Sequence, residues 1–365
     1  MTLLTRYLIR QNLFLLFATL MMGTGIYLLT DLFERLDNFL QSGIELDEVL
    51  LYYAVKTPII ISMILPAVFL ITMVVQMNVL ERSRELVALN AGGIAPAALV
   101  RFVLLYGLLW ALAQFIFAQV IGVEGERQAG RIWQEEVRGK VLEDASINGL
   151  WFTEGRMIVH IEKAFPVQGR GEGLLAYVLD ASGVGIETIV KAERFTVAND
   201  DIWLLEDVQQ LVPARYETTR MDALNLPMTQ DLRTFQVTAG ATVKPAQLSL
   251  FELSQAIARL ERAGSNVEIL RTAWHGKLSY ACSIIVMGLL ALYVTKKTSN
   301  IYKAIVFSLI IVFFFYGTNT LCTSMAEKGH LSPPTGAWFA NALFSGLASL
   351  LLLWPTLRRR LGWSE

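Results

Sequence analysis

Charged residues are scarce in this sequence. Asp, Glu, Lys and Arg supply 17% of the 365 residues and hydrophobic residues supply 54%, whereas ordinary soluble domains contain about 25% charged residues. The net charge is −1 and no basic tail or basic stripe occurs, so the charge pattern gives no indication of nucleic-acid binding. Together with a mean hydropathy of +0.47, this composition predicts a membrane protein.

Motifs for catalysis and metal binding are also missing. The two cysteines, Cys282 and Cys322, lie in apolar runs and are predicted to be small buried hydrophobic residues rather than a disulfide. The three histidines lack metal-ligand spacing, and the chain has neither a phosphate-binding Gly-x4-Gly-Lys-Ser/Thr loop nor a Gly-x-Ser-x-Gly nucleophile elbow. We therefore expect a non-catalytic chain without a metal or cofactor. Any process that needs free energy would then draw it from a partner or from an ion gradient.

Long apolar runs, in contrast, are abundant. Six of them reach the roughly 20 residues that a helix needs to cross a bilayer. They cover residues 12–30, 49–78, 98–122, 273–295, 302–325 and 335–356. The first is interpreted as an uncleaved signal anchor, because no small-residue cleavage pattern follows it. The sequence therefore predicts three membrane spans, a large insertion and three further spans.

The positive charges predict the orientation of these spans. If both termini are cytoplasmic, the two short outer loops hold only Arg35 and Lys328. The cytoplasmic segments then hold Arg6, Arg10, Arg82, Arg84, Arg101, Lys296, Lys297, Lys303, Arg358, Arg359 and Arg360. This asymmetry places the insertion outside the membrane, on the side opposite to both termini.

The insertion is predicted to be all-β, of sandwich or roll type. Short alternating stretches recur in it, and turn residues such as Asn148-Gly149 and Ser182-Gly183 separate them. The stretches cover residues 149–153, 156–161, 174–179, 188–192 and 201–205.

A helix is predicted after the β region, with Ser249 and Glu252 as its capping box and Gly264 at its end. It would link the insertion to the fourth span. The predicted domains are therefore 1–124 with three spans, 125–246 with the β domain, 247–270 with the linker helix, and 271–365 with three spans.

Ionisable residues inside the predicted spans are costly in lipid and therefore informative. Lys56 lies about two turns into the second span, and Arg271, His275 and Lys277 enter the fourth, all from the outer side. One interpretation is that these side chains extend to the outer headgroup layer, which we favour for Arg271. The alternative, left open for Lys56 and Lys277, is an interior cavity whose cations bind an anionic, phosphorylated amphiphile.

A short charged segment, residues 80–93, interrupts the apolar runs between the second and third spans. Treated as one helix, it has an apolar face of Val79, Leu80, Leu86 and Val87, and an opposite arc of Glu81, Arg82, Arg84 and Glu85 with Leu89 on the charged side. Gly92-Gly93 would end it, and Pro96 suits the first turn of the next span. Such a helix either lies on the membrane surface or docks a soluble partner.

These segments resemble the YjgP/YjgQ (LptF/LptG) permease family of the lipopolysaccharide exporter. The similar segments are Arg6-Tyr7-Leu8, residues 31–39 after the first span, residues 83–93, and residues 124–129 leaving the third span. The layout of three spans, a β insertion and three spans is similar over the whole length. The exit of the first span, Leu36-Asp37-Asn38-Phe39, resembles the LptG member more than LptF.

The resemblance implies a six-span α-helical membrane protein with a periplasmic β-jellyroll-like insertion, in the inner membrane of a Gram-negative bacterium. It implies a permease that works with a sister permease, LptF, and with two copies of the cytoplasmic ATPase LptB, which uses ATP and Mg²⁺. Lipopolysaccharide would enter a cavity between the two permeases from the outer leaflet, and would then pass towards the periplasmic proteins LptC and LptA.

The resemblance also implies roles for particular residues. The segment near residues 80–92 would be the coupling helix, with Glu85 as the acidic position that contacts the ATPase and with Glu81, Arg84 and Leu89 beside it. The candidate cavity residues are Arg35, Lys56 and Lys277. Arg35 departs from the family pattern, because it stands among Asp31, Glu34 and Asp37 where further cations are expected.

Two other classes of function remain open from the sequence. A secondary transporter driven by ions would need carboxylates at mid-membrane depth, and none of the six runs has an Asp or Glu at its centre. A membrane-anchored binding or scaffold protein would use the β domain but would leave the charged segment at residues 80–93 without a role. Co-purification of a soluble ATPase would discriminate the exporter from both.

Overall fold

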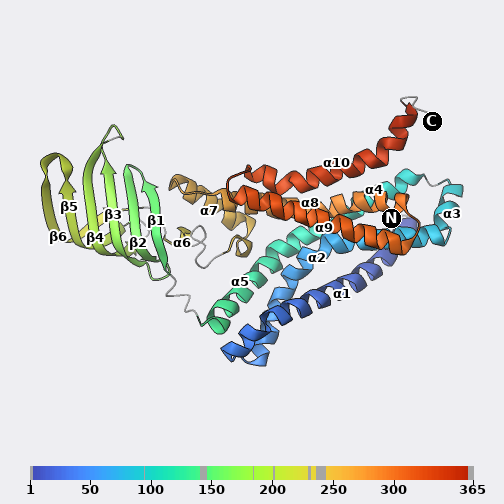
Figure 1. Ribbon diagram of the computed structural model, residues 1–365, viewed down its shortest axis with the longest axis horizontal. Helices are drawn as coiled ribbons and strands as arrows, with labels where there is room; N and C mark the ends of the chain where they lie inside the picture. The colour runs from blue at the N-terminus through green and yellow to red at the C-terminus, as the bar shows by residue number, and fades with distance from the viewer. Residues whose placement is uncertain are drawn as a thin grey trace. The chain divides into compact units, whose positions relative to one another are not determined.

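The structure of the chain is a computed structural model, which describes residues 3–93, 95–139, 146–183, 185–199, 202–228, 232–235 and 244–360. The chain divides into two compact units, Met1–Ala129 together with Thr272–Glu365, and Gly130–Arg271. The first unit is helical, and the second contains a β-sheet (Figure 1).

Helices make up the first unit and its boundaries. They are α1 (Leu3–Ser42), α2 (Leu46–Arg82), α3 (Glu85–Ala91), α4 (Pro96–Phe117), α5 (Val123–Ile132), α8 (Glu268–Lys297), α9 (Ile301–Glu327) and α10 (Pro333–Arg360). A π-helical segment, Ala118–Gly122, joins α4 to α5. Within the described residues, six helices are long and apolar enough to cross a membrane. The prediction of six spans is therefore confirmed, and α4 begins at Pro96 as expected.

The central helices of this unit are α2 and α8. In the most apolar stretch of each, 56% of the residues are buried, compared with 17–28% in the other four spans. Phe69 and Met73 of α2 and Met287 of α8 are completely buried. Gly288 permits this packing, because a Cβ at that position would lie only 3.1 Å from a methyl group of Val103. Helices that are apolar on all sides suit such a central position.

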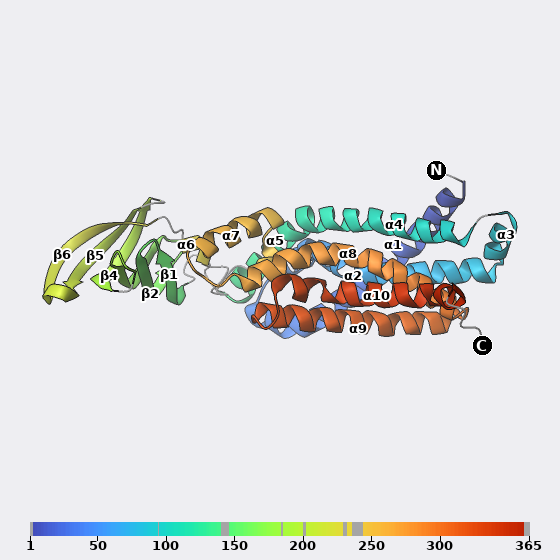
Figure 2. The same ribbon diagram turned by 90° about the horizontal axis from the view of Figure 1, so that it is seen from above.

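The other long helices pack against a neighbour and keep apolar surface exposed. α1 packs along α2, and α9 packs along α10 (Figure 2). Phe14 and Met21 of α1 are 76% and 77% exposed, and Phe313 of α9 is 73% exposed. Large apolar side chains on the outside of a helical bundle are stable when lipid or another membrane chain covers them.

A buried polar contact fixes α1 against α2. The Asn12 side chain donates a hydrogen bond to Gln76 at 3.0 Å, and Gln76 donates to the carbonyl oxygen of Leu8 at 2.8 Å. Asn12 and Gln76 are both completely buried. Because buried polar groups are stable only when they are hydrogen-bonded, these contacts select one register of α1 along α2.

The second unit contains a single antiparallel sheet of six described strands. They are β1 (Ile147–Glu154), β2 (Met157–Phe165), β3 (Arg170–Leu179), β4 (Ile186–Asn199), β5 (Ile202–Val212) and β6 (Glu217–Pro227). Each strand pairs with the next along the chain. The predicted all-β insertion is therefore confirmed, and the described strands form one sheet in chain order.

The strand predictions differ from the structure in two places. The turn predicted at Asn148-Gly149 is wrong, because both residues lie inside β1, whereas Ser182 lies in a turn as predicted. The strand β6 was not predicted, and the predicted strand residue Asp201 lies outside the described residues.

The helix after the sheet is α7 (Leu250–Arg262), preceded by the short α6 (Leu232–Phe235). The predicted capping box is present: the Ser249 hydroxyl accepts from the backbone N–H of Glu252, and the Glu252 carboxylate accepts from the backbone N–H of Ser249. Gly264 follows the helix with a φ of 65°. The backbone N–H of Thr153 donates to the carbonyl of Ala263, so the end of α7 is bonded to β1.

Residues with a positive φ form a line across the sheet. Gly149 of β1, Gly173 of β3 and Asp207 of β5 have positive φ values of 66°, 68° and 56°. The strand register places the three on one line across the sheet. At this line the alternation of buried side chains skips a position, for example from Leu205 to Val208 in β5. The strands therefore keep apolar side chains buried on both sides of the line.

Gly173→Ala is expected to loosen the sheet at this line. A Cβ at position 173 would lie 2.7 Å from the Cβ of Glu162, and its positive φ alone disfavours an L side chain by about 1–2 kcal/mol. Hydrogen–deuterium exchange of β2 and β3 in the purified chain should measure the loss of protection. Gly149→Ala is the matched control, because its φ is 66° and nothing lies within 4 Å of the added Cβ. Equal loss of protection in both variants would contradict the role of the Glu162 contact.

Candidate functional site

The charged segment between the second and third spans forms two helices rather than one. α2 ends at Arg82, α3 begins at Glu85, and Arg84 between them has a φ of 58°. The prediction of a single amphipathic helix is therefore wrong, because a left-handed residue resets the helical phase. Leu80 is completely buried at the end of α2, whereas Val87, predicted to share its apolar face, is 65% exposed.

Two acidic side chains connect this segment to the helical unit. The Tyr7 hydroxyl of α1 donates a hydrogen bond to Glu85 at 3.0 Å, and the Ser299 hydroxyl between α8 and α9 donates to Glu81 at 2.9 Å. Leu86 packs against the apolar core. The segment is therefore bonded to the N-terminal and the C-terminal helices of the unit.

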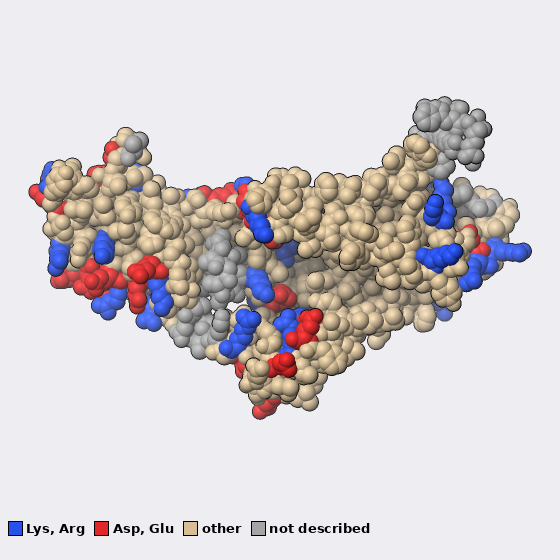
Figure 3. Space-filling model, viewed as in Figure 1, with Lys and Arg blue, Asp and Glu red and all other residues tan. Residues whose placement is uncertain are grey.

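The remaining side chains of the segment form a mixed surface. Arg82, Arg84 and Val87 are exposed, and Leu89 is half-buried. Figure 3 shows charged side chains of the helical unit near α3 and near the α1–α2 turn, with a long uncharged surface between them. A small helix with apolar and charged side chains at the end of an apolar bundle is suited to a directional contact with a soluble protein.

A second group of charges lies towards the other end of α1 and α2. Lys56 Nζ of α2 lies 2.9 and 2.8 Å from the two carboxylate oxygens of Asp31. Arg35 Nε lies 3.0 Å from the same carboxylate, one helical turn after it on α1. The Lys56 ammonium also donates to the Tyr52 hydroxyl at 3.0 Å. One anion and two cations give this cluster a net charge of +1.

Aromatic rings enclose this cluster. Phe39, Tyr52 and Tyr53 pack edge to face, with ring centroids 5.1 to 6.1 Å apart. Lys56 Nζ lies 5.1 Å from the centre of the Tyr52 ring, where the negative face of the ring favours a cation. Asp31 is 7% exposed, so the ion pairs are held in a poorly solvated place.

The role of Asp31 was missed from the sequence. The predicted first span ended at residue 30, whereas α1 continues to Ser42. Asp31 therefore lies within a continuous helix, and its spacing of four residues from Arg35 is the signal that could have indicated the pair. The Lys56 ammonium contacts this carboxylate at 2.9 and 2.8 Å.

The comparison with known families identifies the chain. Residues 6–354 match the family described as Lipopolysaccharide export system permease LptF/LptG. The chain belongs to this family. As an LptF/LptG permease with six membrane-spanning helices, it is a multi-pass membrane protein. The comparison with curated proteins finds no match.

The other ionisable residues that the sequence analysis singled out in the spans of this LptF/LptG permease lie at the start of α8. Arg271 is exposed and pairs with Glu261 of α7, with Nε 2.9 Å from the carboxylate. Lys277 and His275 are half-buried. The two cysteines are both unpaired; Cys322 is buried and Cys282 is half-buried.

Proposed function

We propose that this LptF/LptG permease is the LptG-type subunit of an ATP-driven lipopolysaccharide exporter in the Gram-negative inner membrane. Its partners would be the sister permease LptF, two copies of the cytoplasmic ATPase LptB, and LptC and LptA in the periplasm. The exit at residues 36–39 supports the LptG-type assignment. The distribution of Lys and Arg supports cytoplasmic termini and a periplasmic β domain.

The observation that carries this proposal is the attachment of α3. A seven-residue helix presents exposed side chains and is bonded to α1 through its first residue, Glu85. Glu81, at the end of α2 and four residues before it, is bonded to the α8–α9 turn. Movement of α3 by LptB, as it binds and hydrolyses ATP, would therefore move two parts of the bundle. A secondary transporter or a scaffold has no need of such a helix.

The path from α3 to the outer end of the bundle runs through α1. Tyr7 joins α3 to the start of α1, and Asn12 with Gln76 holds α1 against α2. The cluster of Asp31, Arg35 and Lys56 lies on the same two helices. Displacement of α1 along α2 would therefore alter the geometry of the charge cluster.

The cations of this cluster are suited to the phosphate groups of lipopolysaccharide. Arg35 is the more accessible one, with 31% of its side chain exposed compared with 12% for Lys56. In the proposed mechanism Arg35 binds a substrate phosphate, and Lys56 contributes charge while it holds Asp31. Lys277 of α8 is the third candidate contact. Charge-assisted hydrogen bonds to phosphate are strong in poorly solvated places.

The test is purification of the tagged chain from its own membrane, followed by reconstitution with the ATPase that accompanies it. We expect LptB and LptF to co-purify, and we expect ATP to drive release of lipopolysaccharide from the vesicles to LptC and LptA. Release driven by an ion gradient without ATP would indicate a secondary transporter. Retention of lipopolysaccharide without an ATPase partner would indicate a scaffold.

A further inference from the structure

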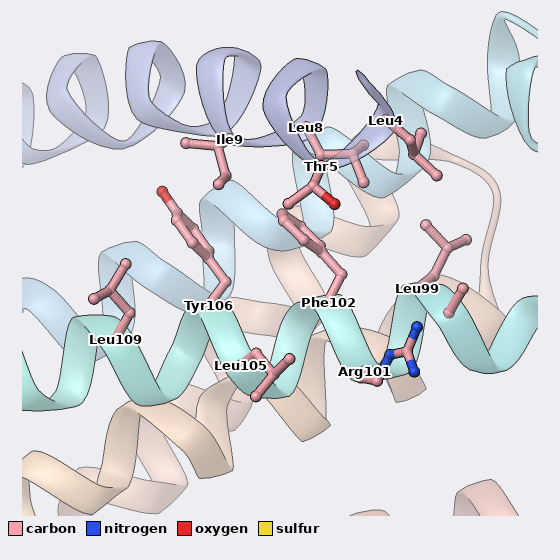
Figure 4. A pocket seen from close by; sticks show the side chains of 11 residues that line it. Leu4, Thr5, Leu8, Ile9, Leu99, Arg101, Phe102, Leu105, Tyr106 and Leu109 are labelled. Atoms are coloured by element: carbon pink, nitrogen blue, oxygen red, sulfur yellow. The ribbon is translucent and has the colours of Figure 1, made fainter. Parts of the chain in front are cut away.

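A pocket of about 660 Å³ lies between the first turns of α1 and the first half of α4 (Figure 4). Leu8 and Ile9 contribute one wall, and Phe102, Leu105 and Leu109 contribute another. Its size lies within the roughly 300–1,000 Å³ that is typical of sites for small ligands. The pocket belongs to neither charge cluster described above.

The walls of this pocket continue into the outer surface of α4. Leu105 is 60% exposed and Leu109 is 58% exposed, whereas Leu8 on the opposite wall is only 1% exposed. A ligand in the pocket would therefore be covered by protein on one side and would reach the surrounding membrane on the other. Such a partly open, apolar groove is suited to a lipid chain.

Besides Thr5, two polar side chains line the pocket, and they lie at different depths. Arg101 is exposed on the second turn of α4. Tyr106 is 4% exposed, and its hydroxyl has no hydrogen-bond acceptor among the described residues. Its ring packs near Phe69 and Phe102, with centroids 5.9 and 5.4 Å away. Figure 4 shows the hydroxyl pointing across the pocket towards Ile9.

The spacing of these two groups resembles the arrangement of polar groups in a phospholipid. Five residues along a helix correspond to about 7.5 Å, so the cation of Arg101 and the buried hydroxyl of Tyr106 lie at different heights, with the apolar side chain of Leu105 between them and that of Leu109 beyond. A glycerophospholipid has its phosphate outermost, its ester oxygens next and its acyl chains deepest. A buried hydroxyl without an acceptor is unfavourable, and an ester oxygen would supply the missing acceptor.

We propose that this pocket binds one anionic glycerophospholipid of the leaflet at this end of the bundle. The phosphate lies on Arg101, an ester oxygen accepts from the Tyr106 hydroxyl, and an acyl chain runs between Ile9 and Leu105. The bound lipid fills the space between α1 and α4 close to Tyr7, and thereby supports the α1 segment that is bonded to Glu85. The site is independent of the lipopolysaccharide cations on the outer part of α1.

The test is native mass spectrometry of the full chain in detergent, with phosphatidylglycerol or phosphatidylethanolamine added at equal concentration. We expect wild type to retain one phosphatidylglycerol in preference to phosphatidylethanolamine. Arg101→Gln should weaken retention of phosphatidylglycerol about tenfold, as expected for loss of a charged hydrogen bond, and Tyr106→Phe should weaken it less. Lys303→Gln is the matched control, because Lys303 is an exposed cation at the start of α9, and it should change nothing.

A second measurement covers the case in which Arg101→Gln fails to fold. A phosphatidylglycerol with a photoreactive acyl chain should label residues 97–116 in wild type, and Leu105→Trp, which fills the groove, should remove that label. Equal retention of phosphatidylglycerol by wild type and Arg101→Gln, or no preference over phosphatidylethanolamine, would overturn the proposal. Crosslinking of position 105 to another polypeptide in native membranes, in place of lipid, would overturn it as well.

Discussion

Glu85→Lys is expected to abolish lipopolysaccharide export while the chain stays folded in the membrane. The substitution removes the acceptor of the Tyr7 hydroxyl and places a cation beside Arg84, where a basic group of LptB would be repelled. Loss of a partly buried charge contact at an interface costs about 2–5 kcal/mol, which corresponds to at least about thirtyfold weaker binding. Export from vesicles and the amount of LptB that co-purifies with the tagged chain measure the effect.

Two conservative variants separate the partner contact from the contact within the chain. Tyr7→Phe removes the hydrogen bond to Glu85 but keeps the carboxylate, so LptB should still bind. Glu85→Gln keeps an acceptor for Tyr7 but removes the charge, so binding of LptB should fall.

Leu89→Asp should behave like Glu85→Lys, and Arg82→Ala should have a smaller effect. Export at the wild-type rate by Glu85→Lys would show that α3 is only a solvated surface helix.

Asp31→Asn is expected to destabilise the chain more than any other replacement of a charged residue by an uncharged one in the cluster of Asp31, Arg35 and Lys56. It leaves Lys56 and Arg35 as two cations in a poorly solvated place without their shared anion. Removal of one partner from a buried ion pair costs about 3–5 kcal/mol. Thermal unfolding of the purified chain in detergent, followed by near-UV circular dichroism, measures the loss.

A double substitution distinguishes the structural role of this cluster from its proposed role in substrate binding. Adding Lys56→Gln to Asp31→Asn should recover part of the lost stability, because one of the two unpaired cations is removed as well. Binding of lipopolysaccharide should not recover, and Arg35→Gln alone should weaken it. Lys56→Glu is unsuitable as the first variant, because it would place a second carboxylate beside Asp31. Wild-type binding of lipopolysaccharide by the double variant and by Arg35→Gln would exclude the cluster as a substrate contact.

Much of the architecture could be predicted because its causes are local. A run of about 20 apolar residues is sufficient for a membrane span, so the six spans followed from composition and length alone. The capping box at Ser249 and Glu252 was predictable because its donors and acceptors lie three residues apart. The positive φ inside β1 was not predictable, because Gly149 in a short polar dipeptide is equally typical of a turn.

The charged segment at residues 80–93 shows the limit of helical periodicity. The sequence indicated a short charged helix ending near Gly92, and α3 ends at Ala91. A periodic pattern assumes one continuous phase, and the left-handed Arg84 interrupts it. The spacing of the residues could therefore not predict which side chains of the segment are buried, or that Val87 is exposed.

The sequence by itself determined the class of this protein: its membrane spans, its β insertion and its membership of the LptF/LptG permeases. Only the tertiary structure decided which polar side chains meet. Tyr7 and Glu85 are 78 residues apart, Asp31 and Lys56 are 25 apart, and Glu81 and Ser299 are 218 apart. Contacts over such separations depend on how the helices pack, and packing is set by the shape of the whole bundle rather than by any local pattern of residues.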